Sequence, residues 1–328
     1  MITTKPKKVS MDLIEKMKND KGITFKYTTT KKAANYLLTS NNYLRTAAYR
    51  KNYNCSKGKY VNLDFSYLQE LSTLDMHLRF ILNKMCMDIE HFLKVALLKD
   101  MESDVLVDGY DIVEKYLSKN QWVLDNIARN SGSVFVRDLC DKYLTFDGKH
   151  KSITKYDQCP IWVFIEIIPF GIFISFYNFY YDEIMKLKRQ KSPHIRTAQK
   201  RRLSVPLLNI VKSVRNVCSH NNCILAELHT GKAAPPQEIS QIIAKIPTIS
   251  AEQRNRRLHS RTSMEYACLL YAYDKIVTEK VSRHRIDELR KFLKNRMPQK
   301  EKFFVKNDLI TSTFSFMNNV FDYFFANR

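Results

Sequence analysis

One segment of the chain combines residue types that can cleave RNA: Arg215-Asn216, followed by His220-Asn221-Asn222. Imidazole titrates near neutral pH, so His220 can act as a general acid or base in an attack by the RNA 2′-hydroxyl. The guanidinium of Arg215 can hold a phosphate in a fork and stabilise the charge that builds on it. Asn216 lies four residues before His220, on the same helical face, where its amide can orient the ring. We expect no metal and no other cofactor, because no cluster of acidic residues accompanies this segment.

The spacing of this motif favours a site built from two copies of the chain. On a helix, Arg215 and His220 lie about 7.5 Å apart along the axis and are rotated by about 140°. One copy therefore does not converge tightly on one phosphate, whereas two copies across a twofold axis can. We accordingly expect a homodimer. The alternative is a polar helix end whose groups are capped and satisfied locally, and the pattern alone does not decide between them.

A second match to the same pattern runs from Arg254 to His259 (Arg-Asn-Arg-Arg-Leu-His). It lies in a very basic stretch with little apolar periodicity. We therefore interpret it as a phosphate-binding or solvated face rather than as a second catalytic site.

The charge of the chain indicates a polyanionic partner. Lys and Arg number 54 against 33 Asp and Glu, a formal net charge of +21. RNA is the predicted partner, and the alternatives are an anionic membrane surface or a generally Lys-rich proteome. The candidate RNA-binding residues lie in basic stretches and are Lys188, Arg189, Arg196, Lys200, Arg201, Arg202, Arg254, Arg256, Arg257, Arg45 and Arg50.

Three further features place the chain in the cytoplasm. The seven cysteines include no Cys-x-x-Cys pair, which argues against a zinc site or a disulfide framework and favours a reducing compartment. Residues 1–8 are basic, but no apolar run follows them, so we expect no signal peptide. Residues 161–181 are nearly all apolar and about long enough to span a bilayer, yet they include Glu166, Pro169 and Gly171. We predict a buried core helix with a bend near Pro169, and no membrane partner.

Low glycine (7) and proline (9) contents favour an all-α fold with short connections. The clearest helix is predicted over 63–101, with a stripe from Leu71 through Phe92 to Ala96, and Asp75 and Arg79 spaced for a salt bridge. A helix over 31–50 should bury Ala34, Leu37, Leu38, Leu44 and Ala48. Further helices are predicted over 111–128, 160–187, from Pro206, from Glu238, and over 263–280, 286–297 and 309–325. The simplest organisation is a basic, Tyr-rich N-terminal extension (1–60) before one helical domain (61–328).

Four blocks of residues, in order along the chain, resemble the Abi-like abortive-infection family, in particular its AbiD/AbiF type. They are Asn42-Tyr43-Leu44-Arg45 with Tyr49; Leu74-Asp75 with Leu78-Arg79 and Ile89-Glu90; Pro160-Ile161-Trp162 with Glu166, Phe170-Gly171 and Tyr177; and Arg215 to Asn222. The last block also resembles the R-x4-6-H motif of HEPN domains. For Glu90 and Glu166 we expect either ion pairs with Arg79 or Arg215 or contacts between helices.

This resemblance implies an all-α, HEPN-like helical bundle and metal-independent endoribonuclease activity of a toxin-like kind, used in bacterial defence against phage. It also implies a homodimer and a structured noncoding RNA as a possible partner. A second interpretation stays open, in which the chain forms a ribonucleoprotein with such an RNA and does not cleave.

Overall fold

The computed structural model describes residues 7–104, 106–130, 132–148, 152–191, 201–231 and 233–328. The predicted all-α fold is confirmed: within these residues strands occur only in two short antiparallel hairpins. One pairs β1 (Cys55–Ser56) with β2 (Lys59–Tyr60), and the other pairs β3 (Thr145–Phe146) with β4 (Ile153–Lys155).

The chain forms two compact units. The first unit contains the described residues up to Cys86 together with Ser213–Asp274 and Thr278–Arg328, and the second contains Met87–Lys212 with Lys275–Val277. Three helices contribute residues to both units: α4 (Phe65–Glu102), α10 (Val205–Ser219) and α13 (Arg261–Ile276).

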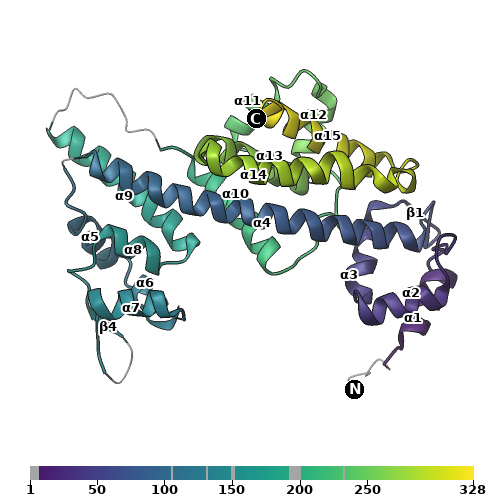
Figure 1. Cartoon of the computed structure of the whole chain (residues 1–328), viewed down its shortest axis with the longest axis horizontal. Helices are drawn as coiled ribbons and strands as arrows, with labels where there is room; N and C mark the ends of the chain where they lie inside the picture. The colour runs from purple at the N-terminus through teal and green to yellow at the C-terminus, as the bar shows by residue number, and fades with distance from the viewer. Residues whose placement is uncertain (1–6, 105, 131, 149–151, 192–200, 232) are drawn as a thin grey trace. The chain divides into compact units, whose positions relative to one another are not determined.

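The remaining elements each belong to one unit (Figure 1). The first unit adds α1 (Ser10–Asn19), α2 (Thr30–Thr39), α3 (Tyr43–Ala48), η1 (Tyr49–Asn52), α11 (Gln237–Ile243), α12 (Ala251–Leu258), α14 (Glu279–Lys291), η2 (Phe292–Arg296), η3 (Met297–Phe303) and α15 (Asp308–Phe325). The second unit adds α5 (Asp111–Lys119), α6 (Trp122–Asn130), α7 (Val134–Tyr143), α8 (Ile161–Ile167) and α9 (Phe170–Lys191).

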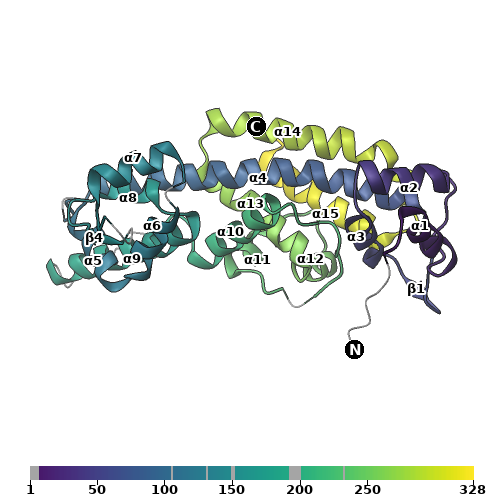
Figure 2. The same ribbon diagram turned by 90° about the horizontal axis from the view of Figure 1, so that it is seen from below.

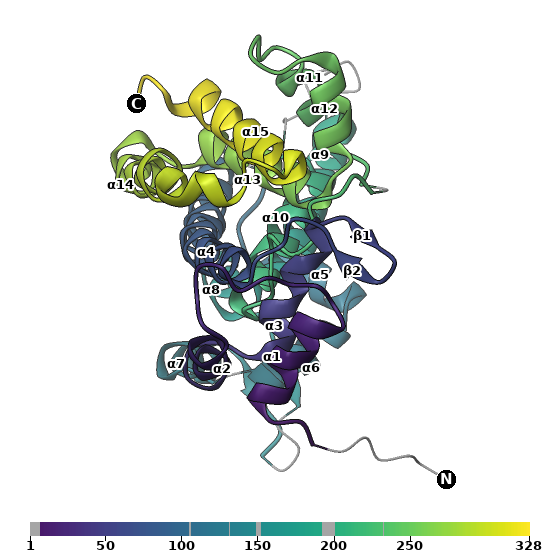
Figure 3. The ribbon, with the colours of Figure 1, turned by 90° about the vertical axis from the view of Figure 1, so that its right-hand side faces the viewer.

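The core of the first unit is built on the N-terminal part of α4, with α14 along one of its sides and α13 and α15 beside it (Figure 2). Polar contacts join these helices at their edges: Lys84 of α4 pairs with Glu288 of α14 at 2.6 Å, and the Tyr266 hydroxyl of α13 donates to the Met317 carbonyl of α15 at 3.3 Å. At one end of α4, α1 and α2 pack together (Figure 3). The motif helix α10 contributes its last two turns, from Ser213 onward, to this unit.

The predicted long helix is confirmed as α4, and its buried stripe follows the predicted positions up to Ile89. Beyond that point Leu93 and Leu97 are buried, whereas Phe92 and Ala96, predicted to be inward, are only half-buried. The predicted positions follow a spacing of about 3.5 residues, whereas a straight helix has about 3.6 residues per turn. Over several turns the predicted positions therefore rotate away from the buried face of the helix.

The prediction of one helix over residues 31–50 was wrong. The chain forms α2 and α3, separated at Ser40–Asn42, where the Asn42 side chain caps α3 by accepting from the Arg45 amide at 2.9 Å. The break shifts the helical phase, so Leu38 and Leu44 point outward with 72% and 78% of their surface exposed. Ala34 and Leu37 are buried as predicted, while Ala48 is half-buried.

The apolar stretch predicted to bend near Pro169 is instead broken there into α8 and α9. Proline has no amide hydrogen and disfavours a helical residue before it, and Ile168 is accordingly extended. The apolar side chains of α8 and α9 form the core of the second unit and include the buried Phe164, Phe173 and Tyr177. No described helix combines the length and the apolar character that a membrane crossing requires.

Other helix boundaries also differ from the predictions. The helix predicted over 111–128 is split into α5 and α6 at Asn120, and the one predicted over 263–280 ends at Ile276, before α14 starts at Glu279. The helix α12 was not predicted. For Glu90 and Glu166 the structure shows ion pairs with a lysine. Both face Lys94 of α4, at 3.9 and 3.7 Å, so the two carboxylates join α4 to α8 through one lysine.

All seven cysteines are free, and five of them are buried. Burial raises the pKa of the Cys218 thiol and of the Cys159 thiol to about 12 each, and that of Cys140 to about 11. These thiols therefore stay protonated at neutral pH and pack as small apolar side chains.

Candidate functional site

The catalytic motif predicted from the sequence lies in the last turns of α10. Pro206 occupies the second residue of this helix, where its missing amide hydrogen costs nothing. Leu207, Val211, Val214 and Cys218 form the buried stripe. Arg215 and Asn216 are half-buried and His220 is exposed, so the motif lies away from the buried stripe.

The end of α10 has the hydrogen bonds of a Schellman cap, and this explains part of the motif. The Asn221 amide donates to the Cys218 carbonyl at 3.0 Å, and the Asn222 amide donates to the Val217 carbonyl at 2.9 Å. Asn221 has the left-handed φ of 58° that this cap requires, and asparagine tolerates this conformation better than most residues. His220 is thus the last residue before the chain turns, and its exposure follows from the cap.

The polar side chains of the motif do not bond as the sequence suggested. The Arg215 guanidinium donates through Nη1 to Oδ1 of Asn216 at 3.3 Å. In the described part of the chain the Asn216 side chain makes no hydrogen bond to the His220 ring, so it steadies the arginine instead. The imidazole of His220 has no hydrogen bond or ion pair among the described residues. The Ser219 hydroxyl bonds to Oδ1 of Asn83 at 3.0 Å and ties the helix end to α4.

A buried ion pair holds the loop that follows the motif. Asp75 is fully buried and bonds to Arg79, as the spacing predicted, and Arg79 is buried as well. The Asp75 carboxylate also accepts from the Leu225 amide at 2.5 Å, and Arg79 Nη1 donates to the Asn222 carbonyl at 3.3 Å. Breaking such a pair leaves an uncompensated buried charge, so it fixes the loop strongly.

Asn52 holds the same loop from the N-terminal side. Its side-chain amide donates to the Leu225 carbonyl at 2.8 Å and accepts from the Leu228 amide at 3.0 Å. No role was predicted for Asn52 from the sequence. Its placement next to a Tyr-rich segment carries no local pattern that distinguishes it, because its partners lie more than 170 residues away.

The second Arg-Asn match lies at the end of α12 and is structurally different. Arg257 is buried, with 2% of its surface exposed, and donates through Nη1 to the Thr313 hydroxyl at 2.7 Å. Burial and, to a smaller extent, the charge of Arg256 lower the pKa of Arg257. Nδ1 of His259 bonds to the Asn255 carbonyl of its own helix at 2.7 Å. Arg257 is therefore an internal structural residue, and the prediction that it contacts RNA at the surface was wrong.

The remaining candidate RNA-binding residues differ in whether an acidic side chain pairs with their positive charge. In the second unit, Lys188 pairs with Asp104 at 2.8 Å and Arg202 pairs with Asp100 at 2.6 Å. Arg201 pairs with Asp182, and Arg189 is exposed. Arg196 and Lys200 lie outside the described residues.

In the first unit the candidate cations lie on α3, η1 and α12. Arg256 pairs with Glu252 at 2.6 Å, and Arg254 is half-exposed. Arg45 and Arg50 are half-exposed, and the Arg50 guanidinium lies 6.0 Å from the centroid of the Tyr60 ring. An arginine against an aromatic face is one way to present a planar cation to a base or a phosphate.

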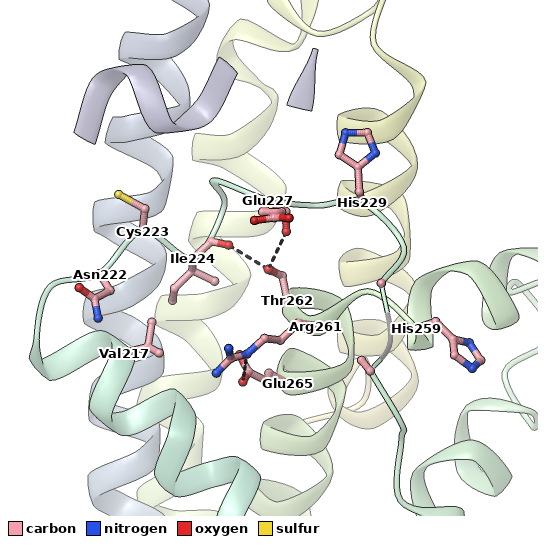
Figure 4. Close-up of a pocket in the computed structure, with 12 residues that line it drawn as sticks. Val217, Asn222, Cys223, Ile224, Glu227, His229, His259, Arg261, Thr262 and Glu265 are labelled. Atoms are coloured by element: carbon pink, nitrogen blue, oxygen red, sulfur yellow. Dashed lines mark hydrogen bonds and ion pairs between the residues drawn. The ribbon is translucent and has the colours of Figure 1, made fainter. Parts of the chain in front are cut away.

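A pocket of about 460 Å³ adjoins the motif (Figure 4). The end of α10, the described residues of the loop that follows it, His259 and the start of α13 line it. The wall includes Val217 and Asn222 from the first Arg-Asn segment and His259 from the second, so both segments border one pocket. No cluster of three or more metal-ligating side chains occurs within the described residues.

Comparison with known proteins agrees with the resemblance seen in the sequence. The family model described as Abi-like protein matches residues 36–226, which is more than half of the chain and includes the whole motif. No curated protein and no solved structure gives a significant match. The match covers α4, α8, α9 and α10, which carry the blocks that pointed to this family. The chain therefore belongs to the family of Abi-like proteins.

Proposed function

We propose that this protein is an abortive-infection effector that cleaves RNA, with Arg215 and His220 as its catalytic residues. Membership of the Abi-like family implies the role in abortive infection. The observation that carries the catalytic part is the state of His220. Its imidazole stands exposed at the end of α10 and is without a partner among the described residues, next to a half-exposed arginine. His259, in the second Arg-Asn segment, differs in this respect, because its Nδ1 bonds to the Asn255 carbonyl.

The chemistry needs a base, an acid and a cation. The base removes the proton from a 2′-hydroxyl, and the oxygen attacks the adjacent phosphorus. The acid protonates the departing 5′-oxygen, which leaves a cyclic phosphate and a free 5′-hydroxyl. Arg215 stabilises the additional negative charge on the phosphate oxygens. Each chain contributes one motif histidine, so a homodimer supplies the two that act as base and acid.

The surface next to the motif supports a second copy as partner. Asn83, which bonds Ser219, is half-buried on α4, and on the same helix Met76 and Phe80 expose 37% and 57% of their surface. These three residues recur at spacings of four and three, so they share one helical face. An exposed apolar face beside the motif fits a dimer that brings two copies of Arg215 and His220 together.

One observation favours a second function, RNA binding without cleavage. Asn221 is explained by the helix cap alone, so part of the motif has a structural reason that is independent of catalysis. The net charge of +21 serves both functions equally. In this alternative the protein forms a ribonucleoprotein with a structured noncoding RNA, and the motif only shapes the surface.

The test uses the full chain and its His220→Ala variant, each incubated with RNA in the presence of a chelator. The proposal predicts cleavage products with cyclic phosphate ends for the wild type and none for the variant, with similar RNA affinity for both. Loss of RNA affinity in His220→Ala would contradict the catalytic role. Cleavage by neither protein, together with one defined RNA that co-purifies, would support the alternative.

A further inference from the structure

We propose that the pocket beside the motif binds one nucleobase of the RNA, and that it prefers bases with an exocyclic amino group over uracil. The inference rests on the proposed function for its location: Val217 and Asn222 of the wall lie on either side of His220 in the chain. Val217 is three residues before His220, about 4.5 Å along the axis of α10. A base in the pocket therefore belongs to a nucleotide close to the reacting phosphate.

The size of the pocket suits this ligand. Its volume of about 460 Å³ lies in the range of about 300–1,000 Å³ that is typical of small-molecule sites. Val217 and Ile224 supply apolar surface, and the wall also includes His229 and His259 (Figure 4). Proteins that recognise single-stranded RNA hold unstacked bases against apolar or aromatic side chains and bond their edges to polar groups.

The charged groups of the pocket are compensated, which favours a neutral heterocycle over a phosphate. Arg261 bonds to Glu265 at 2.9 Å and to the Ser213 hydroxyl at 3.1 Å. Glu227 pairs with Lys51 at 3.1 Å. The Arg261 side chain remains 68% exposed, so it can still reach a backbone phosphate outside the pocket while the base lies inside.

The wall contains several hydrogen-bond acceptors. Nε2 of His229 lies 2.9 Å from the Lys51 carbonyl, and Nδ1 of His259 lies 2.7 Å from the Asn255 carbonyl. A carbonyl only accepts, so these nitrogens carry the hydrogen, and in the neutral ring the other nitrogen accepts. With the Glu227 carboxylate, these acceptors select a base with amino hydrogens. Adenine, cytosine and guanine have such a group, and uracil has none.

The experiment measures fluorescence anisotropy of two labelled RNA octamers, oligocytidylate and oligouridylate, bound to the full-length His220→Ala protein. The two probes have the same backbone and charge and differ chiefly in the amino group. We expect oligocytidylate to bind about tenfold more tightly, a difference of about 1.4 kcal/mol. Equal affinity for the two probes would overturn the proposal.

Two matched pairs of variants test whether the preference for oligocytidylate arises in the pocket. Ala233 lines the pocket, whereas the neighbouring Ala234 is exposed and is not part of its wall, so Ala233→Trp should abolish the preference and Ala234→Trp should retain it. Glu227→Gln, which replaces an acceptor by an amide, should reduce the preference. Glu279→Gln is the control, because Glu279 is similarly exposed and pairs with Arg283. A preference that survives Ala233→Trp would also overturn the proposal.

The outcomes separate this inference from the proposed function. A cytidine preference that depends on Ala233, together with a wild type that does not cleave RNA, would support the base-binding pocket and refute the proposed nuclease activity. Cleavage that depends on His220, without any base preference, would support the nuclease activity and refute the base-binding pocket.

Discussion

The pattern Arg-Asn-x-x-x-His occurs twice in this chain, and the structure uses the two copies in opposite ways. At Arg215–His220 the apolar side chains of the helix are buried, and the arginine and histidine remain at the surface. At Arg254–His259 the fourth residue of the pattern, Arg257, lies in the interior, and the histidine bonds to its own helix. The difference shows that the pattern has no function by itself: the burial of the intervening residues decides which of its groups can reach a substrate.

The largest difference between the two segments should appear in catalysis. His220→Ala should lower the rate of RNA cleavage by about 10²–10⁴-fold, because a general acid or base contributes that much. His259→Ala should change the rate only a few-fold. Single-turnover cleavage of a labelled RNA measures both, and thermal unfolding of each variant checks that the fold is intact. An equal loss in the two variants would remove the distinction drawn between the segments.

Stability should show the reverse order at the arginines. Arg257→Ala should cost about 3 kcal/mol of unfolding free energy, because it removes a buried side chain and its bond to Thr313. Arg215→Ala should change the stability by no more than about 0.5 kcal/mol, since this residue is half-exposed and bonds only to Asn216 among the described residues. Urea unfolding followed by circular dichroism provides the comparison. A tolerated Arg257→Ala would mean that the second segment is not structural.

The helix ends should also respond differently to substitution. Asn221→Ala should destabilise the protein by about 1 kcal/mol, because alanine is strained in the left-handed conformation, whereas Asn221→Gly should be neutral. The end of α12 needs no such residue, because His259 has an ordinary right-handed backbone. Chemical denaturation of the two Asn221 variants measures the effect. Equal stability of the alanine and glycine variants would argue against the cap.

The smallest effect is expected at Arg254, the half-exposed arginine of the second segment. If it contacts one phosphate, Arg254→Ala should weaken RNA binding uniformly across sequences and reduce the slope of log affinity against log salt by about 1. Arg202→Ala serves as a control, since Arg202 is already paired with Asp100. Binding measured at several salt concentrations distinguishes them. An unchanged slope in Arg254→Ala would remove this residue from the RNA-binding surface.

Local patterns were sufficient wherever the side chains of one segment decide the outcome. The heptad-like spacing from Leu71 to Ile89 predicted α4, and Pro206 after a polar stretch predicted the start of α10. The Arg215–Asn222 block, together with the three blocks that precede it, indicated the family from the order of residues alone. Local patterns failed at Asn42 and Asn120, where polar residues interrupt helices that periodicity alone would continue.

In the candidate site, too, local features could be predicted from the sequence and long-range contacts could not. The residues of the motif and the cap at Asn221 were readable from the sequence, because a cap depends on the backbone of five or six consecutive residues. The pocket was not readable, because Val217, Glu227 and His259 meet only after α10, α12 and α13 have packed. Arg257 was assigned to the surface for the same reason: charge favours exposure, and only its partner Thr313, 56 residues away, makes burial acceptable.

The all-α fold, the family and the motif could be predicted from the sequence, since each depends on periodicity or on the order of residues along the chain. Which polar and charged side chains are buried and paired depends on how the helices pack. The Asp75 carboxylate bonds to the Leu225 amide across 150 residues, and Asn52 bonds to the same loop across 173. Such contacts depend on where helices pack after folding, and no local spacing encodes them. They hold the loop that follows the motif.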